Sequence, residues 1–255
     1  MTTGKVRILI TGFGPFPGAP YNPTAKLVER LVRLPRPAFA NVERIGHVFP
    51  VSYRAVDAQL PALLAQHEPD ALLMFGLATR TPYCRIEARA RNAITQLWPD
   101  ADHAAVVSRT IDPTAPATRR FGPHTHHLLQ AAKATGIDVR PSINAGAYLC
   151  NYLSWRAIEA AGQHPRSLPL AAFVHVPKVP RDAHSGKPEA VSFEQLVDAG
   201  EAILMTLIQR ARTCGIFHKA TFRRPRAGGT QTVFRLDVMH RMKDITGPPK
   251  CIIKF

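Results

Sequence analysis

Short apolar runs alternate along the chain with longer stretches in which apolar residues recur at helical spacing. The apolar or alternating runs predict strands over residues 6–13, 43–51, 69–78, 84–94 and 170–180. The helical spacing predicts helices over residues 22–34, 53–67, 126–136, 150–162 and 192–211. Since strands and helices alternate, the sequence predicts an α/β fold, a three-layer α/β/α sandwich around a mostly parallel, mixed sheet.

Two segments do not fit this alternation. Residues 108–125 form a Pro- and Thr-rich connection that is longer than most loops, which predicts either a functional flap or a flexible surface excursion. Residues 212–255 have no sustained helical or strand period and contain Gly-Gly and Pro-Pro pairs. We therefore expect a single α/β domain over residues 1–211 and an irregular, basic C-terminal extension over residues 212–255, whose order the sequence leaves open.

The basic charge of the chain is concentrated in that extension. Of the formal net charge of +15, residues 212–255 carry +8 and the rest of the chain carries +7. A basic excess attracts nucleic acid, but a charged chain end is more often a solvated tail, so a nucleic-acid partner is not favoured. No window approaches the roughly 18 consecutive apolar residues of a membrane span, and no signal segment precedes the first strand. These features predict a cytoplasmic protein without a membrane partner and leave its oligomeric state, a homo-oligomer included, open.

The first predicted strand runs into a glycine-rich loop of a kind that often binds phosphate. A dinucleotide-binding loop has the spacing GxGxxG and a helix that starts at the last glycine, but here the spacing is GxGxxxG and the helix starts only after Pro23. Pro15 and Pro17 remove two N–H donors and the loop contains no Lys, so phosphate binding is not favoured. The loop instead offers the rings of Phe13 and Phe16 at the carboxyl edge of the sheet, where they either contact a ligand or fill the core.

Three residues that lie far apart in the sequence suggest covalent catalysis. Cys150 follows a small-residue turn and lies where a helix begins, and the helix dipole is expected to lower the pKa of a thiol there. His175 ends one strand and Glu87 follows another, so both are placed where reactive groups gather in an α/β sheet. A thiol nucleophile needs such a base and a residue that orients it. Each residue taken alone also fits a structural role, as a buried thiol, a core histidine or a member of a surface ion pair.

The sequence does not predict a metal site. The four cysteines lie far apart with no CxxC pair, which suggests neither a zinc knuckle nor a dense disulfide framework. The cluster of His124, His126 and His127 has no cysteine or carboxylate at metal-ligand spacing.

Several stretches taken together resemble one family, pyroglutamyl peptidase I, also called the pyrrolidone-carboxylate peptidases. The stretches are "ILITGFGPFPGAPYNPT", "FGLATR" with "IEARARN", "NAGAYLCN" and "FVHVP", and they follow the order of the family over residues 6–211. By position, the resemblance implies that Cys150 is the nucleophile, His175 the base and Glu87 the third catalytic residue. It also implies that the substrate pocket is lined by Phe13, Phe16, Leu77, Tyr148 and Leu149.

The resemblance implies a thiol peptidase that removes N-terminal pyroglutamate from peptides through a thioester acyl-enzyme, without a cofactor. The uncharged lactam of such a substrate suits two aromatic rings better than a phosphate would. Leu77 in place of Gln, Thr79 in place of Gly and Ala88 in place of Arg depart from the family around one wall of the expected pocket. Two alternatives therefore stay open: a related thiol amidase for another cyclic or acyl-capped amide, and a basic nucleic-acid-binding protein on an inactive peptidase scaffold.

Overall fold

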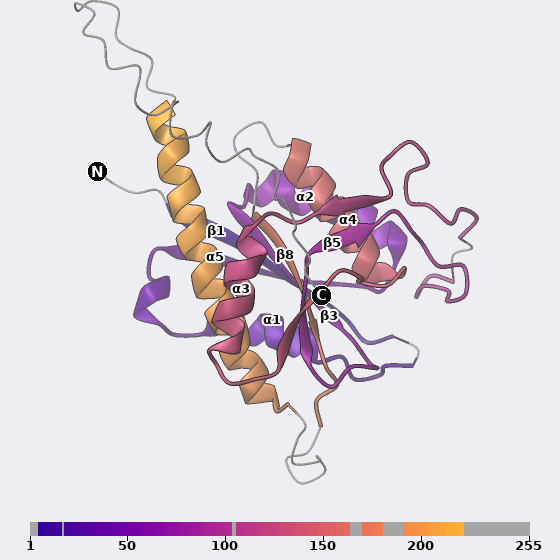
Figure 1. The fold of residues 1–255 in the computed structure, drawn as a ribbon, viewed down its shortest axis with the longest axis horizontal. Helices are drawn as coiled ribbons and strands as arrows, with labels where there is room; N and C mark the ends of the chain where they lie inside the picture. The colour runs from indigo at the N-terminus through magenta and orange to yellow at the C-terminus, as the bar shows by residue number, and fades with distance from the viewer. Residues whose placement is uncertain (1–4, 17, 104–105, 164–169, 181–190, 222–255) are drawn as a thin grey trace, which may run out of the picture. The chain divides into compact units, whose positions relative to one another are not determined.

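The described part of the chain is built around a six-stranded sheet (Figure 1). The structure, a computed structural model, describes residues 5–16, 18–103, 106–163, 170–180 and 191–221. Across the sheet the strands are β2 (Val42–Phe49), β1 (Val6–Phe13), β3 (Ala71–Leu77), β8 (Leu170–Val176), β4 (Cys84–Glu87) and β7 (Val139–Ser142). The first four strands are parallel, whereas β4 is antiparallel to β8 and parallel to β7. The sheet is therefore mixed and mostly parallel, as predicted.

Helices cover both faces of this sheet. One face, called here the three-helix face, is covered by α1 (Pro23–Arg33), α3 (His124–Lys133) and α5 (Phe193–Thr221), which lie together in Figure 1. The other, called here the two-helix face, is covered by α2 (Tyr53–His67) and α4 (Leu149–Gln163). A short 3-10 helix spans Pro37–Phe39. The predicted three-layer α/β/α sandwich is confirmed.

Alternation along the strands separates two apolar cores. In β8, Val174 packs into the core of the three-helix face and Phe173 into the core of the two-helix face. Since successive side chains of a strand point to opposite faces, His175 shares the two-helix face with Phe173. In β4, Ile86 likewise belongs to the first core, which leaves Glu87 on the two-helix face. His175 and Glu87, each at or near the end of its strand, therefore lie on the face that α2 and α4 cover.

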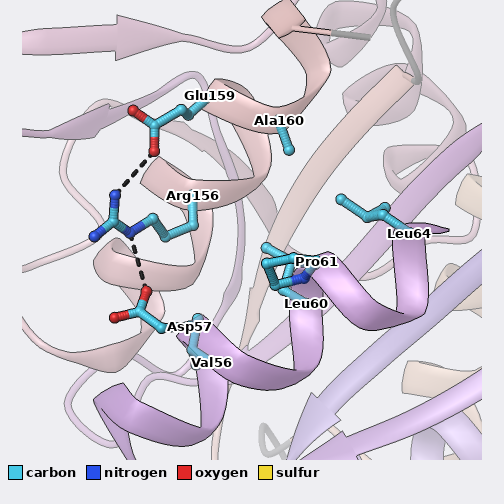
Figure 2. A pocket seen from close by; sticks show the side chains of 8 residues that line it. All are labelled: Val56, Asp57, Leu60, Pro61, Leu64, Arg156, Glu159 and Ala160. Carbon is cyan, nitrogen blue, oxygen red and sulfur yellow. Dashed lines mark hydrogen bonds and ion pairs between the residues drawn. The ribbon is translucent and has the colours of Figure 1, made fainter.

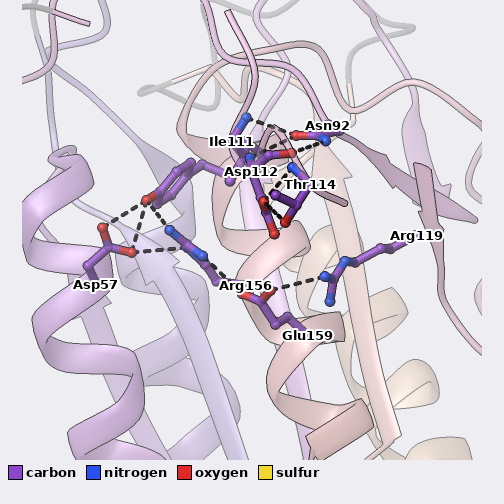
Figure 3. A network of polar contacts seen from close by, with 9 residues as sticks. Asp57, Asn92, Ile111, Asp112, Thr114, Arg119, Arg156 and Glu159 are labelled. Atoms are coloured by element: carbon purple, nitrogen blue, oxygen red, sulfur yellow. Dashed lines mark hydrogen bonds and ion pairs between the residues drawn. The ribbon is translucent and has the colours of Figure 1, made fainter. Parts of the chain in front are cut away.

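A small two-stranded ribbon follows β4. Its strands, β5 (Arg89–Arg91) and β6 (Thr118–Arg120), pair antiparallel. The side-chain oxygen of Asn92 accepts hydrogen bonds from the backbone N–H groups of Ile111 (2.9 Å) and Asp112 (3.0 Å), and its NH₂ group donates to two carbonyls of the same segment (Figure 3). One side-chain amide therefore anchors the long connection that the sequence left open as a flap or a flexible excursion.

A polar network joins α2 to α4 beside a surface groove. Arg156 donates to Asp57 (Nε to Oδ1, 3.1 Å) and to Glu159 (Nη1 to Oε2, 2.9 Å), and the hydroxyl of Tyr152 donates to Asp57 (2.8 Å) (Figure 3). The adjacent groove has a volume of about 270 Å³ and a largely apolar lining (Figure 2). It is lined by Val56, Asp57, Leu60, Pro61, Leu64, Arg156, Glu159 and Ala160. None of the predicted site residues, all of which the structure describes, lines this groove, so it is not the expected substrate pocket.

The last helix extends beyond the predicted end of the domain. The sequence predicts a helix as far as residue 211, whereas α5 continues to Thr221. Once a helix is nucleated, each added residue gains a hydrogen bond, and residues 212–221 contain no proline to stop it. Residues 222–255 lie outside the described residues, so the character of the extension stays a prediction. Within the described ranges, no helix is long and apolar enough to cross a membrane.

Candidate active site

The glycine-rich loop after β1 is held against the start of α1. A Cβ added at Gly12 would lie 2.9 Å from the carbonyl oxygen of Thr24, so the close approach of strand and helix requires glycine here. The hydroxyl oxygen of Thr24 accepts from the N–H of Phe13 (3.0 Å), and Asn22 donates to the carbonyl of Gly14 (3.1 Å). Asn22 also caps α1 by accepting from the N–H of Thr24. These contacts fix the part of the loop that joins the two aromatic residues.

Four of the five predicted pocket residues gather on the two-helix face. Phe13 is 2% exposed and Leu149 is 1% exposed within the apolar core of that face. Phe16 and Tyr148 pack against the same core and are only partly buried. Leu77 is partly buried at the end of β3, where alternation assigns it to the three-helix face. Its role in substrate binding stays a prediction, as do the roles of the other four.

The segment before α4 is braced by a neighbouring loop. The hydroxyl of Tyr148 donates to the carbonyl of Pro99 (2.8 Å), and its ring meets the ring of Tyr53 edge-on at a centroid distance of 6.0 Å. The N–H of Thr95 donates to the carbonyl of Ala147 (2.6 Å). The turn that leads into Cys150 is thereby held from two sides.

Glu87 and His175 form a buried pair, although they are 88 residues apart. Nδ1 of His175 lies 2.7 Å from Oε1 of Glu87, and the two residues are 3% and 0% exposed. Burial opposes the charge of Glu87, but the hydrogen bond that His175 donates is the largest of several contributions that together outweigh it, so the pKa of Glu87 is lowered. An ionised carboxylate only accepts hydrogen bonds, so Nδ1 carries the hydrogen and Nε2 keeps its lone pair. Burial lowers the pKa of His175 despite Glu87, which leaves the imidazole neutral at pH 7.

The sulfur of Cys150 packs against β3. Cys150 is the second residue of α4, and a Cβ added at Gly76 would lie only 2.7 Å from its Sγ. Gly76 is also the register partner of His175 in the pairing of β3 with β8. The candidate nucleophile therefore lies over the strand position that is paired with the candidate base.

The expected lowering of the thiol pKa is not found. Burial raises the pKa of Cys150 to about 12, and the negative charge of Glu87 adds to this effect. The positive charge of Arg85 and the N–H of Cys150 itself act in the opposite direction but are weaker. Dipole effects at a helix terminus are modest, and here burial outweighs them. The resting thiol is therefore protonated, and a base has to remove its proton during attack.

Two further residues, Phe173 and Gly76, shape this site and were not predicted from the sequence. The ring of Phe173 packs on the imidazole of His175 at a centroid distance of 5.0 Å. A Cβ at Gly76 would lie 2.7 Å from the same ring as well as from the thiol of Cys150. The signals were a glycine near the end of a buried strand, where another chain element approaches closely, and an aromatic residue two positions before the histidine, on the same face.

Comparison with known proteins identifies the family. The family described as pyroglutamyl peptidase matches residues 6–210, a range that contains all eight predicted site residues. The chain belongs to the pyroglutamyl peptidase family. It is 30% identical over 204 residues to a pyrrolidone-carboxylate peptidase of Vibrio vulnificus, covering 80% of this chain and 93% of that relative. It is 29% identical to one of Thermococcus onnurineus over 207 residues, covering 80% of this chain and all of the relative.

A solved pyroglutamyl peptidase relative has the same fold. The pyrrolidone carboxyl peptidase of Thermococcus litoralis superposes with a TM-score of 0.73 at 26% identity, covering 82% of this chain and 96% of that one.

Among the departures from the family, Ala88 uses its backbone to continue β4: its N–H donates to the carbonyl of Ser142 (2.7 Å) and its carbonyl accepts from the N–H of Phe121 (3.0 Å). Replacement of the family's Arg at this position is therefore compatible with the pairing that holds Glu87.

Proposed function

We propose that this protein is a cysteine peptidase that removes N-terminal pyroglutamate from peptides, with Cys150, His175 and Glu87 as its catalytic residues. The observation that carries the proposal is the 2.7 Å contact between the buried carboxylate of Glu87 and the imidazole of His175, beside the strand position on which the thiol of Cys150 rests. Membership of the pyroglutamyl peptidase family supports the substrate class.

The first half of the reaction transfers the acyl group to the enzyme. Nε2 of His175 takes the proton of the Cys150 thiol, and the sulfur attacks the carbonyl carbon of pyroglutamate. The carbonyl oxygen becomes an oxyanion, which N–H groups in the first turn of α4 are suited to bind because they have no partner within the helix. The imidazolium then gives its proton to the leaving amine as the C–N bond breaks, which leaves a thioester and neutral His175.

The second half of the reaction restores the enzyme. His175 takes a proton from water, the hydroxide attacks the thioester, and the carbon–sulfur bond breaks to release pyroglutamate. The sulfur recovers its proton from the imidazolium. Glu87 holds Nδ1 throughout, so that Nε2 remains the nitrogen that exchanges protons.

The pocket proposed for the lactam ring lies among Phe13, Phe16, Tyr148 and Leu149 on the two-helix face. An uncharged five-membered lactam can be bound by apolar and aromatic surface with a few backbone hydrogen bonds. A free N-terminal ammonium would lose its hydration there without gaining an ionic partner. This difference would make the enzyme selective for the blocked terminus.

The experiment that tests the function is hydrolysis of a fluorogenic pyroglutamyl amide beside the prolyl and glutamyl analogues, which have a free amine. We expect turnover of the pyroglutamyl amide only, and loss of this turnover after treatment with a thiol-alkylating agent. Weak turnover here together with strong turnover of another capped amide would instead identify a related thiol amidase. We also propose a cytoplasmic location, because two of the described cysteines, Cys84 and Cys150, are free, as is usual in a reducing compartment.

A further inference from the structure

A cation lies next to the candidate catalytic pair. Arg85 precedes Glu87 by two residues in β4, so both side chains point to the two-helix face. The antiparallel pairing of β4 with β8 sets Arg85 opposite His175 in register. Nε of Arg85 lies 3.5 Å from Oε1 of Glu87, the same oxygen that His175 contacts at 2.7 Å. Two cationic or potentially cationic groups thus share one carboxylate oxygen.

The side chain of Arg85 is placed for a charge effect more than for a hydrogen bond. It is 22% exposed, and its Nε is buried without a hydrogen-bond partner. An unpaired buried donor is unfavourable unless a nearby charge compensates for it. The carboxylate of Glu87, itself fully buried, is the charge that faces it.

We propose that Arg85 is a positioning residue of the catalytic site, which keeps Glu87 ionised, holds resting His175 neutral and favours loss of the Cys150 proton. The proposal rests on the function proposed above. Arg85 acts through its contact with Glu87 and through the effect of its positive charge on His175 and Cys150. It exchanges no proton itself.

The electrostatics of the surrounding groups agree with this role. The positive charge of Arg85 is one of the causes that lower the pKa of Glu87, of His175 and of Cys150, although in none of them is it the largest. Tyr53 of α2 and Tyr148, just before α4, also face Cys150, and burial raises the pKa of each, so both are neutral. Among these facing groups Glu87 and Arg85 are therefore the charged ones at neutral pH.

Removal of Arg85 should raise the pKa of both His175 and Cys150. Without the cation, Glu87 favours the imidazolium more strongly, so the pKa of His175 rises and the acid limb of kcat/KM moves to higher pH. The thiolate of Cys150 also loses a favourable charge, so the pKa of the thiol rises. Loss of a cation at this distance in a partly exposed site should raise the pKa of His175 and that of Cys150 by about 0.5 to 1 pH unit each.

The experiment measures both shifts in Arg85→Gln. The rate of alkylation of Cys150 by iodoacetamide is followed between pH 6 and pH 10, with the modified peptide identified by mass spectrometry, and kcat/KM is measured over the same range. We expect alkylation at a given pH to slow about 3- to 10-fold and the acid limb to move upward by about 0.5 to 1 unit. Arg85→Lys should restore most of both.

Arg140→Gln is the matched control. Arg140 is the register partner of Arg85 on β7, but it is exposed and pairs with Asp138 (2.7 Å), so its loss should leave both profiles unchanged. If Arg85→Gln does not fold, Arg85→Met removes the charge and keeps the apolar stem. Profiles of the folded charge-deleting variant that coincide with those of the unmodified enzyme would overturn the proposal, as would equal shifts in Arg140→Gln. Because alkylation needs no pyroglutamyl substrate, an alkylation shift without any pyroglutamyl hydrolysis would refute the proposed function and not the role of Arg85.

Discussion

Cys84 and Cys150 lie on opposite faces of the same sheet, and burial raises the pKa of each thiol to about 12. Cys84 belongs to the apolar core of the three-helix face. Cys150 borders the two-helix face, where its sulfur rests over the partner position of His175. The thiol pKa alone therefore does not distinguish the inert cysteine from the candidate nucleophile. What differs is that the sulfur of Cys150 rests on Gly76, the register partner of the neutral base His175.

Single strands also carry apolar residues on one face of the sheet and site residues on the other. In β4, Ile86 is apolar and belongs to the core of the three-helix face, whereas Glu87 points to the opposite face and contacts His175. A one-residue shift in the register of this strand would bury the carboxylate in the wrong core. The apolar face therefore does more than stabilise the fold, because it fixes the register that brings the polar residues of the other face together.

The largest difference between the two faces is expected when each cysteine is replaced by alanine. Cys150→Ala removes the proposed nucleophile and should lower kcat/KM for a pyroglutamyl amide by about 10⁴-fold or more. Cys84→Ala removes only a small buried side chain and should lower the free energy of unfolding by about 1 kcal/mol with little change in kcat/KM. Steady-state kinetics and urea unfolding of both variants provide the test. A fully active Cys150→Ala would refute the assignment of the nucleophile.

The next largest effect is expected from the residue that orients the base. Glu87→Gln keeps the shape of the side chain but removes its charge and allows the amide to donate to Nδ1, which favours the wrong imidazole tautomer. We expect kcat to fall by about 10²- to 10⁴-fold. Asp138→Asn is the control, because this carboxylate is exposed and contacts Arg140 at the surface. Similar kinetics for both variants would show that the buried hydrogen bond is dispensable.

The sequence revealed the parts of this site that depend on local pattern. Periodicity predicted β1 and α2 at their observed bounds, and the motifs selected Cys150 together with Glu87 and His175, which form a buried pair. It did not reveal the thiol pKa, because the helix terminus is a local signal whereas burial is set by packing from several elements. It also did not single out Arg85, since register between distant strands decides which of the arginines near Glu87 faces the pair.

Gly76 should show how closely the two-helix face is packed around the thiol. Gly76→Ala places a Cβ 2.7 Å from both the sulfur of Cys150 and the ring of Phe173, so at least one of them has to move. We expect kcat/KM to fall about 10- to 100-fold and the free energy of unfolding to fall by about 1–3 kcal/mol. In Gly162→Ala, near the end of α4, the new Cβ meets nothing within 4 Å, so stability should be kept or slightly increased. Unchanged kinetics in Gly76→Ala would contradict the close contact.

The last expected effect changes stability and not turnover: the free energy of unfolding depends on pH through one histidine on each face. Burial lowers the pKa of His175 on the two-helix face and of His124 of α3, whose Nε2 lies 2.8 Å from the carbonyl of Ala171. Below an unfolded-state pKa of about 6.5, the unfolded chain binds protons at these positions that the folded protein does not. The free energy of unfolding should therefore fall between pH 7 and pH 5, by at most about 1.4 kcal/mol per pH unit for each histidine. Glu87 has a lowered pKa and acts only in more acidic solution, so it does not contribute in this range.

Single histidine variants show how much of the pH dependence of the unfolding free energy comes from each face. His124→Gln and His175→Gln should each reduce the slope of unfolding free energy against pH in urea titrations, and the double variant should reduce it further, since the two groups lie on different faces and titrate independently. Only His175→Gln should also abolish hydrolysis. A slope that neither variant changes would mean that both imidazoles gain protons as easily in the folded protein as in the unfolded chain. In that case His175 would already be cationic in mildly acidic solution and could not accept the Cys150 proton there.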